Sequence, residues 1–144
     1  MKTIFTITFA LLTFVLSISC KSPAFGPEYP VTDFSEYNSV VIAHVDEAVH
    51  KDQGYKGLES FNITIKKALK GKLKVRQQIK GKAKKEKARA VCPVTLDKDS
   101  DYLLLLHKSM GKYKLSRFSF PVKKGHQYFN DYIKQIEKIL NKKN

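Results

Sequence analysis

Tyr102-Leu-Leu-Leu-Leu106 decides how the rest of this chain folds. The run contains no charge, and it lies between the polar stretch Asp97–Ser100 and Gly111. A short apolar run enclosed by turn-forming residues is typical of a buried β-strand. We therefore expect residues 102–106 to form the central strand of a sheet, with a polar turn over residues 97–100 in front of it.

Two more strands are expected upstream of this run. Val40-Val-Ile-Ala-His-Val45 is short, apolar and rich in β-branched residues, which indicates a second largely buried strand. From Phe61 to Lys66 apolar and polar residues alternate, as in a strand with one buried face. This strand is predicted to continue to a turn at Lys70-Gly71, and residues 50–58 are predicted to be a loop.

Residues 72–89 form the most basic segment, in which nine Lys and Arg are opposed by Glu86 alone. Apolar residues at positions 73, 75 and 79 predict a weak strand there, and residues 81–87 are predicted to form a charged hairpin tip or loop. The segment is a candidate site for binding a polyanion. Its basic residues are Lys72, Lys74, Arg76, Lys80, Lys82, Lys84, Lys85, Lys87 and Arg89.

The last two strands are expected on either side of the central run. Residues 91–96 are predicted to lie at a sheet edge, because Pro93 has no N–H to donate to a ladder. Gly111 is predicted to open a final strand, in which Tyr113 and Leu115 alternate with polar residues and which ends near residue 121. The fold class is therefore mainly β.

An amphipathic helix over residues 126–141 is expected to end the chain. Apolar residues recur there at helical spacing, namely Phe129, Tyr132, Ile133, Ile136, Ile139 and Leu140. Lys138, Lys142 and Lys143 lie near its end, where cations suit the helix dipole. We expect the apolar stripe to pack against the sheet, with a partner-binding or membrane-surface helix as the alternative.

The first nineteen residues have the features of an export signal. After Lys2, an uncharged run extends from residue 3 to residue 19, and it is rich in Thr and Ser. This suits a cleaved secretory signal better than a transmembrane helix, which needs about 20 mostly apolar residues. We predict a signal peptide over residues 1–19, an extended leader with three prolines over 20–37 and one domain over 38–144.

Cys20 and Cys92 are the two cysteines of the chain. The end of the signal resembles a bacterial lipobox, with a small residue directly before Cys20 and Ser17 where leucine is usual. Cys20 is thus the predicted lipid attachment site of a membrane-anchored protein of the cell envelope. In an oxidising compartment two cysteines also allow one disulfide, in a soluble secreted or periplasmic protein. One sulfur cannot carry both a lipid and a disulfide bond.

The charge of the chain is unevenly distributed. The formal net charge is +14, yet residues 20–65 carry −4 and residues 66–144 carry +17. Such asymmetry suggests a basic face and an anionic partner, although a solvated surface is the alternative. Because nucleic acid is not expected outside the cytoplasm, the predicted partners are acidic polysaccharide, lipopolysaccharide or anionic lipid headgroups.

The order of motifs over residues 20–140 carries a family resemblance. Cys20-Lys-Ser-Pro is followed by the run at 40–45, by Phe61-Asn-Ile-Thr-Ile and by Leu69-Lys-Gly71. Ala90-Val-Cys-Pro-Val-Thr-Leu96, the central run and Gly111-Lys-Tyr-Lys-Leu come next. This order resembles the netrin-like domain of the tissue inhibitors of metalloproteases. The resemblance implies a five-stranded OB-type barrel with flanking helices, in agreement with the strands and C-terminal helix expected above.

The resemblance also implies a function, which is inhibition of a metalloprotease. In that family an N-terminal Cys-x-Cys lies against the barrel, and one of its cysteines pairs with a mid-chain cysteine whose surroundings resemble Cys92. The α-amino group and carbonyl of the first cysteine bind the protease zinc. Here Cys20 stands alone, with Ser22 in place of the second cysteine or Ile18 in place of the first.

No combination of residues in the sequence suggests an enzyme. The four histidines lack metal-ligand spacing, and Lys70-Gly-Lys and Lys80-Gly-Lys lack the pattern of a phosphate-binding loop. Asp97, Asp99 and Asp101 share one turn but lack the Gly and Glu of a calcium loop. We expect a non-enzymatic binding module without catalytic residues, metal or cofactor.

Overall fold

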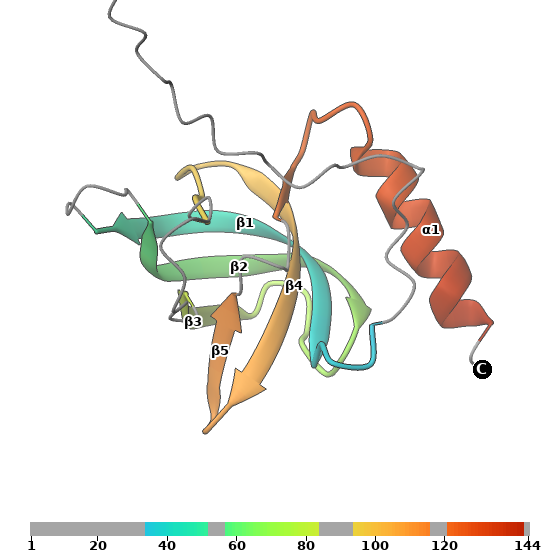
Figure 1. Ribbon diagram of the computed structural model, residues 1–144, viewed down its shortest axis with the longest axis horizontal. Helices are drawn as coiled ribbons and strands as arrows, with labels where there is room; N and C mark the ends of the chain where they lie inside the picture. The colour runs from blue at the N-terminus through green and yellow to red at the C-terminus, as the bar shows by residue number, and fades with distance from the viewer. Residues whose placement is uncertain (1–33, 52–56, 84–93, 116–120, 143–144) are drawn as a thin grey trace, which may run out of the picture.

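The computed structural model describes residues 34–51, 57–83, 94–115 and 121–142. Six strands and one helix occur in these ranges (Figure 1). The strands are β1 (Ser39–His50), β2 (Leu58–Lys70), β3 (Gln78–Ala83), β4 (Asp101–Ser109), β5 (Lys112–Leu115) and β6 (Val122–Lys123), and the helix is α1 (Phe129–Asn141). The mainly β fold with a C-terminal helix is confirmed.

Five of the strands close into a barrel. Their order is β1-β2-β3-β5-β4, and β4 pairs with β1 to complete the ring. All of these pairs are antiparallel except β3 with β5, which is parallel. A five-stranded barrel of this kind is OB-like. β6 adds to β4 through the pairs Tyr102↔Lys123 and Leu103↔Val122.

Alternating side chains of the strands fill the barrel. In β2, for example, Phe61, Ile63 and Ile65 are at most 2% exposed, while the residues between them are partly exposed. The period-2 alternation along a strand sends successive side chains to opposite faces. The strand residues of the interior are Val41, Ala43, Val45, Leu58, Phe61, Ile63, Ile65, Ile79, Tyr102, Leu104, Leu106 and Leu115.

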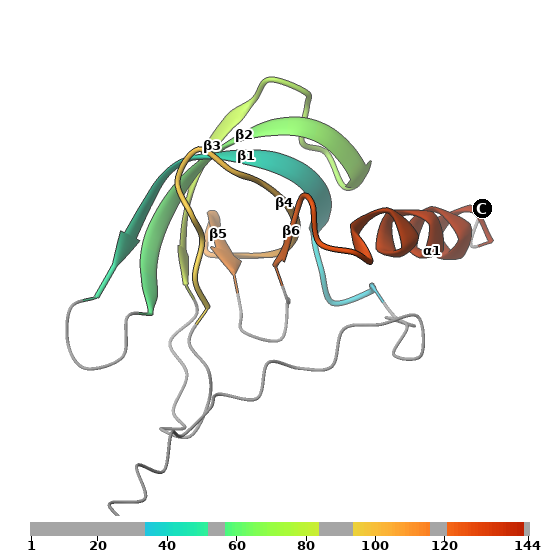
Figure 2. The same cartoon turned by 90° about the horizontal axis from the view of Figure 1, so that it is seen from above.

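A second apolar cluster lies between the barrel and α1. Val40, Leu103 and Leu105 face outward from β1 and β4 and pack with Phe129, Tyr132 and Ile136 of the helix. Figure 2 shows α1 on one side of the barrel, beyond β6. β4 is therefore buried on both faces, and this is why its sequence is a continuous apolar run rather than an alternating one.

Gly71 ends β2 in a sharp turn, as predicted. It has φ +98°, and a Cβ at this position would lie 2.5 Å from the carbonyl oxygen of Asn38. The preceding Lys70 donates hydrogen bonds from Nζ to the carbonyl oxygens of Phe34 and Tyr37. Phe34 and Tyr37 are themselves buried, so the packed unit extends four residues upstream of the boundary expected at residue 38.

Several predicted boundaries differ from the structure. Gly81–Ala83 belongs to β3 instead of a hairpin tip, because Gly81 and Lys82 pair with both β2 and β5. Residues 94–96 do not form a strand. Isolated hydrogen bonds attach them to the barrel, such as the one that Leu58 N–H donates to the Val94 carbonyl oxygen (2.8 Å). The short β6 was not expected.

The helix begins at Phe129 instead of residue 126, and residues 126–128 form a turn before it. The Phe129 N–H donates to the His126 carbonyl (2.9 Å) in that turn. Phe129 is also the first apolar residue of the buried stripe, so burial begins where the helix does.

Candidate functional site

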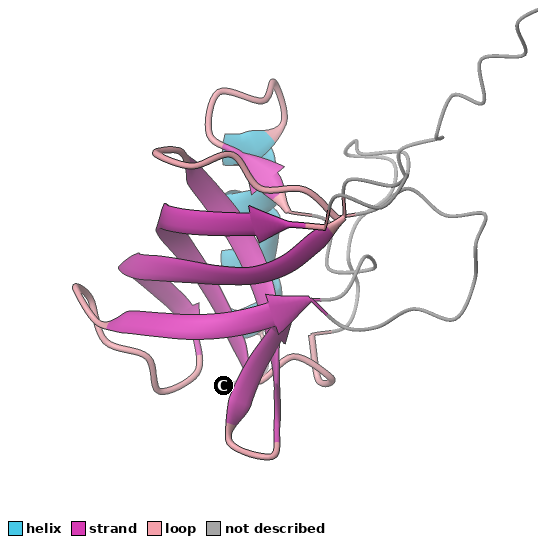
Figure 3. Ribbon diagram, turned by 90° about the vertical axis from the view of Figure 1, so that its left-hand side faces the viewer, coloured by secondary structure: helices cyan, strands magenta, loops and turns pink. Residues whose placement is uncertain are grey.

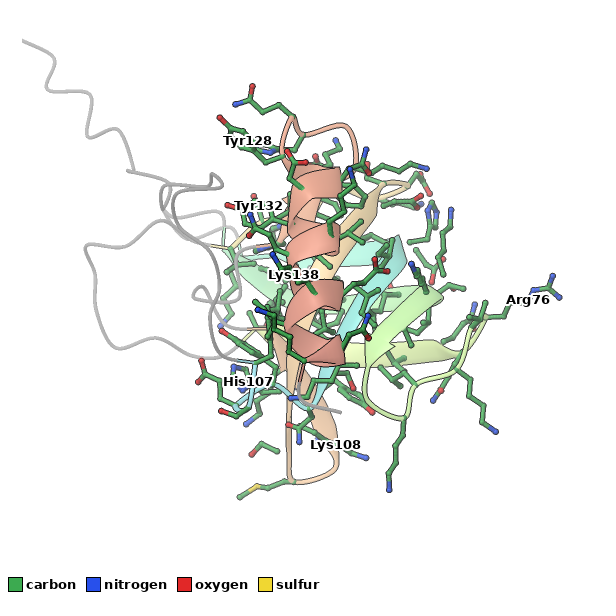
Figure 4. The ribbon with its side chains drawn as sticks, turned by 90° about the vertical axis from the view of Figure 1, so that its right-hand side faces the viewer. Arg76, His107, Lys108, Tyr128, Tyr132 and Lys138 are labelled. Atoms are coloured by element: carbon green, nitrogen blue, oxygen red, sulfur yellow. The ribbon has the colours of Figure 1, made fainter. Side chains whose placement is uncertain are left out.

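The nine basic residues of the predicted polyanion site lie in three different parts of the chain. Lys72, Lys74 and Arg76 lie in the turn between β2 and β3, and Figure 4 shows Arg76 projecting into solvent. Lys80 and Lys82 lie on β3 itself. Residues 84–93, which contain Lys84, Lys85, Lys87, Arg89 and Cys92, lie outside the described residues, as does Cys20.

The sequence of β3 places its two lysines on the outer surface of the barrel. Ile79 and Gly81 are buried, whereas Lys80 and Lys82 are exposed. Gly81 faces the ring of Phe61, its partner on β2, and a Cβ at Gly81 would lie 2.2 Å from Cζ of that ring. The tight contact fixes β3 against β2 and thereby fixes the direction of Lys80 and Lys82.

Parallel pairing with β5 adds two lysines, Lys112 and Lys114, from outside the basic segment 72–89. Lys82 pairs with Lys114 and Gly81 with Tyr113, so the strands lie side by side (Figure 1). Lys112 lines one hollow together with Lys80 and Lys82. We call Lys80, Lys82, Lys112 and Lys114 the lysine cluster. The alternation Lys112-Tyr113-Lys114 indicates a strand with both lysines on one face. It does not indicate that this strand lies beside β3.

The lysine cluster has no acidic partner among the described residues. The lysines of the ion pairs in that part of the chain are Lys51, Lys66, Lys67, Lys123 and Lys124. Like charges that face each other on neighbouring strands are destabilising, by up to about 1 kcal/mol per pair. The pair Lys82 and Lys114 therefore opposes stability unless an anion binds beside it.

Two carboxylates from β1 form the opposite wall of the site. The register of β1 against β2 shifts between Val45 and Glu47, so Asp46 is the extra residue of a bulge. Glu47 accepts a hydrogen bond from Asn62 Nδ2 (2.6 Å), and Asp46 accepts one from Thr64 Oγ1 (2.7 Å). Both acids thus face the outer side chains of β2.

An open groove runs between these acids and the lysines. One hollow of about 390 Å³ has the polar lining residues Glu47, Ser60, Asn62, Lys80, Lys82 and Lys112, and Val49, Phe61 and Gly81 line it as well. A second hollow of about 330 Å³ is lined by Asp46, Asn62, Gln78, Ile79 and Lys80. Asn62 and Lys80 line both, so the two hollows adjoin. Such a groove, with charges of both signs and amide and hydroxyl groups, suits a polar ligand.

The helix leaves this side of the barrel uncovered. Within the described residues, the apolar cluster under α1 draws its strand residues from β1, β2, β4 and β6, and none from β3 or β5. Figure 3 views the barrel from the side opposite the helix, where strands face the viewer directly. In OB folds, the face made by strands 2 and 3 is the usual ligand-binding surface.

A separate charge network lies next to the groove, on β1 and β4. His44 and Asp101 are cross-strand partners, and His44 Nδ1 lies 2.8 Å from Asp101 Oδ1. Lys66 Nζ lies 3.1 Å and Lys124 Nζ 3.8 Å from the same carboxylate, which is 12% exposed. Burial raises the pKa of Asp101, but the hydrogen bonds from His44 and Lys66 outweigh it and lower the pKa overall. Its partners make this carboxylate a structural group.

Two of the three aspartates at the turn before β4, Asp97 and Asp101, are bonded to different partners. Asp97 accepts hydrogen bonds from Lys123 (2.8 Å) and Tyr102 (3.2 Å), and these bonds lower its pKa. Asp101 belongs to the network with His44. Across the described ranges, no three His, Cys, Asp or Glu side chains are grouped so as to hold a metal ion.

Comparison by sequence gives no relative: no protein-family model matches the chain, and no curated protein matches it. Over the part of the chain that the structure describes, no helix has both the length and the apolar character needed to span a membrane.

Proposed function

We propose that the protein is a non-enzymatic exported binding module that holds a polyanion on the outer face of β3 and β5. The observation that carries this proposal is the lysine cluster, whose four ammonium groups have no acidic partner among the described residues. An anion bound there relieves the repulsion between Lys82 and Lys114. The mature chain from residue 20 carries a net charge of +13 (−4 over residues 20–65 and +17 over residues 66–144), which draws polyanions toward the protein over a distance set by the ionic strength.

The test is salt-dependent retention on immobilised heparin or lipopolysaccharide. Replacing all four lysines of the cluster by Gln is expected to lower the salt concentration needed for elution. The matched control replaces Lys98, Lys134, Lys138 and Lys142 by Gln, which removes the same charge from exposed positions outside the predicted site. Equal loss of retention in both variants would mean that net charge alone binds the polyanion.

A separate variant, in which Lys72 and Lys74 are replaced by Gln, tests the loop between β2 and β3 that was predicted as part of the site. If Lys72 and Lys74 contribute, this variant elutes at lower salt than the wild type. We expect a smaller shift than for the lysine cluster, because the turn residues lie at one end of β3 and do not line the groove.

We further propose that Cys20 anchors the protein to a membrane through a lipid, and that the segment before the buried Phe34 links the anchor to the barrel. The support is the lipobox-like sequence before Cys20. A diacyl anchor gives stable attachment, whereas one chain alone is marginal. Labelled palmitate is expected to appear on the mature protein, and globomycin is expected to block its maturation. Release of unlabelled protein to the medium would remove the anchor from the proposal.

Inhibition of a metalloprotease is the alternative for the same cysteine. The OB-like barrel with a C-terminal helix agrees with the fold that the family resemblance implies. This function needs a free α-amino group on Cys20 and a disulfide to Cys92. The intact mass of the mature protein, measured without reductant, distinguishes the lipid anchor from the disulfide. A lipid adds the mass of its acyl chains, whereas a disulfide removes two hydrogens.

A further inference from the structure

We propose that the groove between the acids of β1 and the lysine cluster selects an acidic polysaccharide with free hydroxyl groups. The anionic groups of the polysaccharide lie against Lys80, Lys82 and Lys112, and its hydroxyls donate to Asp46 and Glu47. This rests on the proposed polyanion function and names the class of polyanion. The lysines supply affinity, and the acids supply the selection.

The bulge in β1 is the first support. In a regular strand Asp46 and Glu47 would point to opposite faces, and one of them would enter the barrel. The register shift at Asp46 turns both toward the groove, and Ala48 takes the next inward position. Bulges frequently re-aim a side chain beside a functional site.

The hydrogen bonds of the two acids are the second support. Glu47 is bonded through Oε2 and Asp46 through Oδ2, in both cases to side chains of β2. These bonds hold the carboxylates in position, and within the described residues Oε1 of Glu47 and Oδ1 of Asp46 accept no side-chain bond. An ionised carboxylate only accepts hydrogen bonds, so a ligand group that meets these oxygens has to be a donor.

The spacing across the strands is the third support. Glu47, Asn62 and Lys80 form one row across β1, β2 and β3. Neighbouring strands lie about 4.8 Å apart, so the carboxylate and the ammonium are separated by about 10 Å at the backbone. A chain of sugar rings, each with acidic and hydroxyl substituents, spans this row and meets both walls. Asn62 and Ser60 add polar contacts in between.

The acids also disfavour other polyanions. Polyphosphate has no donor groups along its chain, and its negative charges are repelled by Asp46 and Glu47. An anionic bilayer presents closely packed charges to the whole face. Polyphosphate and an anionic bilayer would therefore contact only the lysines. A hydroxyl-bearing polysaccharide would also donate hydrogen bonds to Asp46 and Glu47, and this difference is the basis of the selection.

The experiment compares three probes by isothermal calorimetry on the intact mature protein. The probes are polygalacturonate, its O-acetylated form with the same charge but blocked hydroxyls, and polyphosphate. The wild type is expected to bind polygalacturonate at least about tenfold more tightly than the acetylated form, the effect of one hydrogen bond to a charged group. Vesicles with anionic lipid form a fourth arm, and a clear preference for them over polygalacturonate would overturn the proposal.

The key variant is Asp46→Asn with Glu47→Gln. Both new side chains keep an oxygen that accepts the bonds from Thr64 and Asn62, and thermal unfolding checks the fold. The preference for free hydroxyls is expected to fall to near unity while polyphosphate binds more tightly. The control, Asp131→Asn with Glu137→Gln on α1, removes the same charge and is expected to keep the preference.

The outcomes separate this inference from the proposed function. If the wild type binds none of the polyanions, the proposed function fails. If it binds all of them through the lysine cluster but with no preference for free hydroxyls, only the selection by Asp46 and Glu47 fails. Equal tightening of every probe in the key variant also overturns the selection, because the acids then act only by repulsion.

Discussion

Gly81 lies directly under the ring of Phe61, its partner across the β2–β3 ladder. A Cβ on Gly81 would come within 2.2 Å of Cζ and 2.8 Å of Cε1 of that ring. Phe61 is 2% exposed, so the ring has no solvent-filled space to move into. This contact joins the barrel interior to the strand that carries Lys80 and Lys82.

Gly81→Ala is therefore expected to destabilise the protein by about 1–3 kcal/mol, the usual effect of overpacking a core. Urea denaturation measures the change. In a Phe61→Leu background the same substitution is expected to be less destabilising, because the smaller side chain leaves room for the methyl group. Additive effects of the two substitutions would show that the contact is not the cause.

Gly71→Ala is expected to be more destabilising than Gly111→Ala. Both glycines have positive φ, +98° and +74°, which alone disfavours alanine by about 1 kcal/mol. At Gly71 the new Cβ also meets the Asn38 carbonyl oxygen at 2.5 Å, whereas at Gly111 nothing lies within 4 Å. Thermal unfolding measures the loss of stability in each variant. Gly71→Ala combines backbone strain with a steric clash, whereas Gly111→Ala introduces backbone strain alone. Equal losses of stability would contradict the clash at Gly71.

Asp101→Asn is expected to lower stability at pH 7 by about 1.5–3 kcal/mol, because it weakens charged hydrogen bonds in a mostly buried site. The pKa of Asp101 is below its unfolded value of about 3.9. The ionised group thus stabilises the fold above about pH 4, and this contribution disappears as pH falls through the folded pKa. Unfolding curves from acid to neutral pH should show a weaker pH dependence in the variant.

Asp99→Asn is the control for this experiment. Asp99 is exposed and has φ +57°, a conformation that asparagine accepts readily. Stability and its pH dependence are expected to stay close to those of the wild type. A loss equal to that of Asp101→Asn would mean that the turn, not the network with His44, is responsible.

Met110→Asn is expected to stabilise the protein by about 0.5–1 kcal/mol. Met110 and Gly111 form the two-residue turn between β4 and β5, with φ +50° and +74°. Turns of this type strongly prefer Asn-Gly, and Met110 is 96% exposed, so no packing is lost. Differential scanning calorimetry should show a higher Tm, and a lower one would indicate that Met110 has a contact in solution.

Local patterns were sufficient for much of the fold. The run at Tyr102–Leu106 identified a central strand, and the alternation from Phe61 and the stripe from Phe129 each identified an element and its buried face. Errors arose at positions where local preference was weak. Gly81 disfavours a strand by itself, but pairing on both sides holds it in one.

The candidate site was less predictable than the fold. Lys80 and Lys82 belong to the basic segment that was predicted as a polyanion site, whereas Lys112 and Lys114 are 30 to 34 residues away and were not predicted. No local pattern marked Asp46 and Glu47, since neighbouring side chains of a regular strand point to opposite faces. The bulge that does so appears only in the register of β1 against β2.

The sequence by itself determined the buried face of the strand from Phe61 and of the C-terminal helix, because the spacing of apolar side chains along one segment reports the face that this segment buries. It also determined the excess of lysine in the second half of the chain. Only the tertiary structure decided which strands are neighbours. Closure of the barrel pairs β3 with β5 in parallel and sets Lys82 beside Lys114. Contacts between distant segments depend on how the whole chain closes, and no local periodicity encodes them.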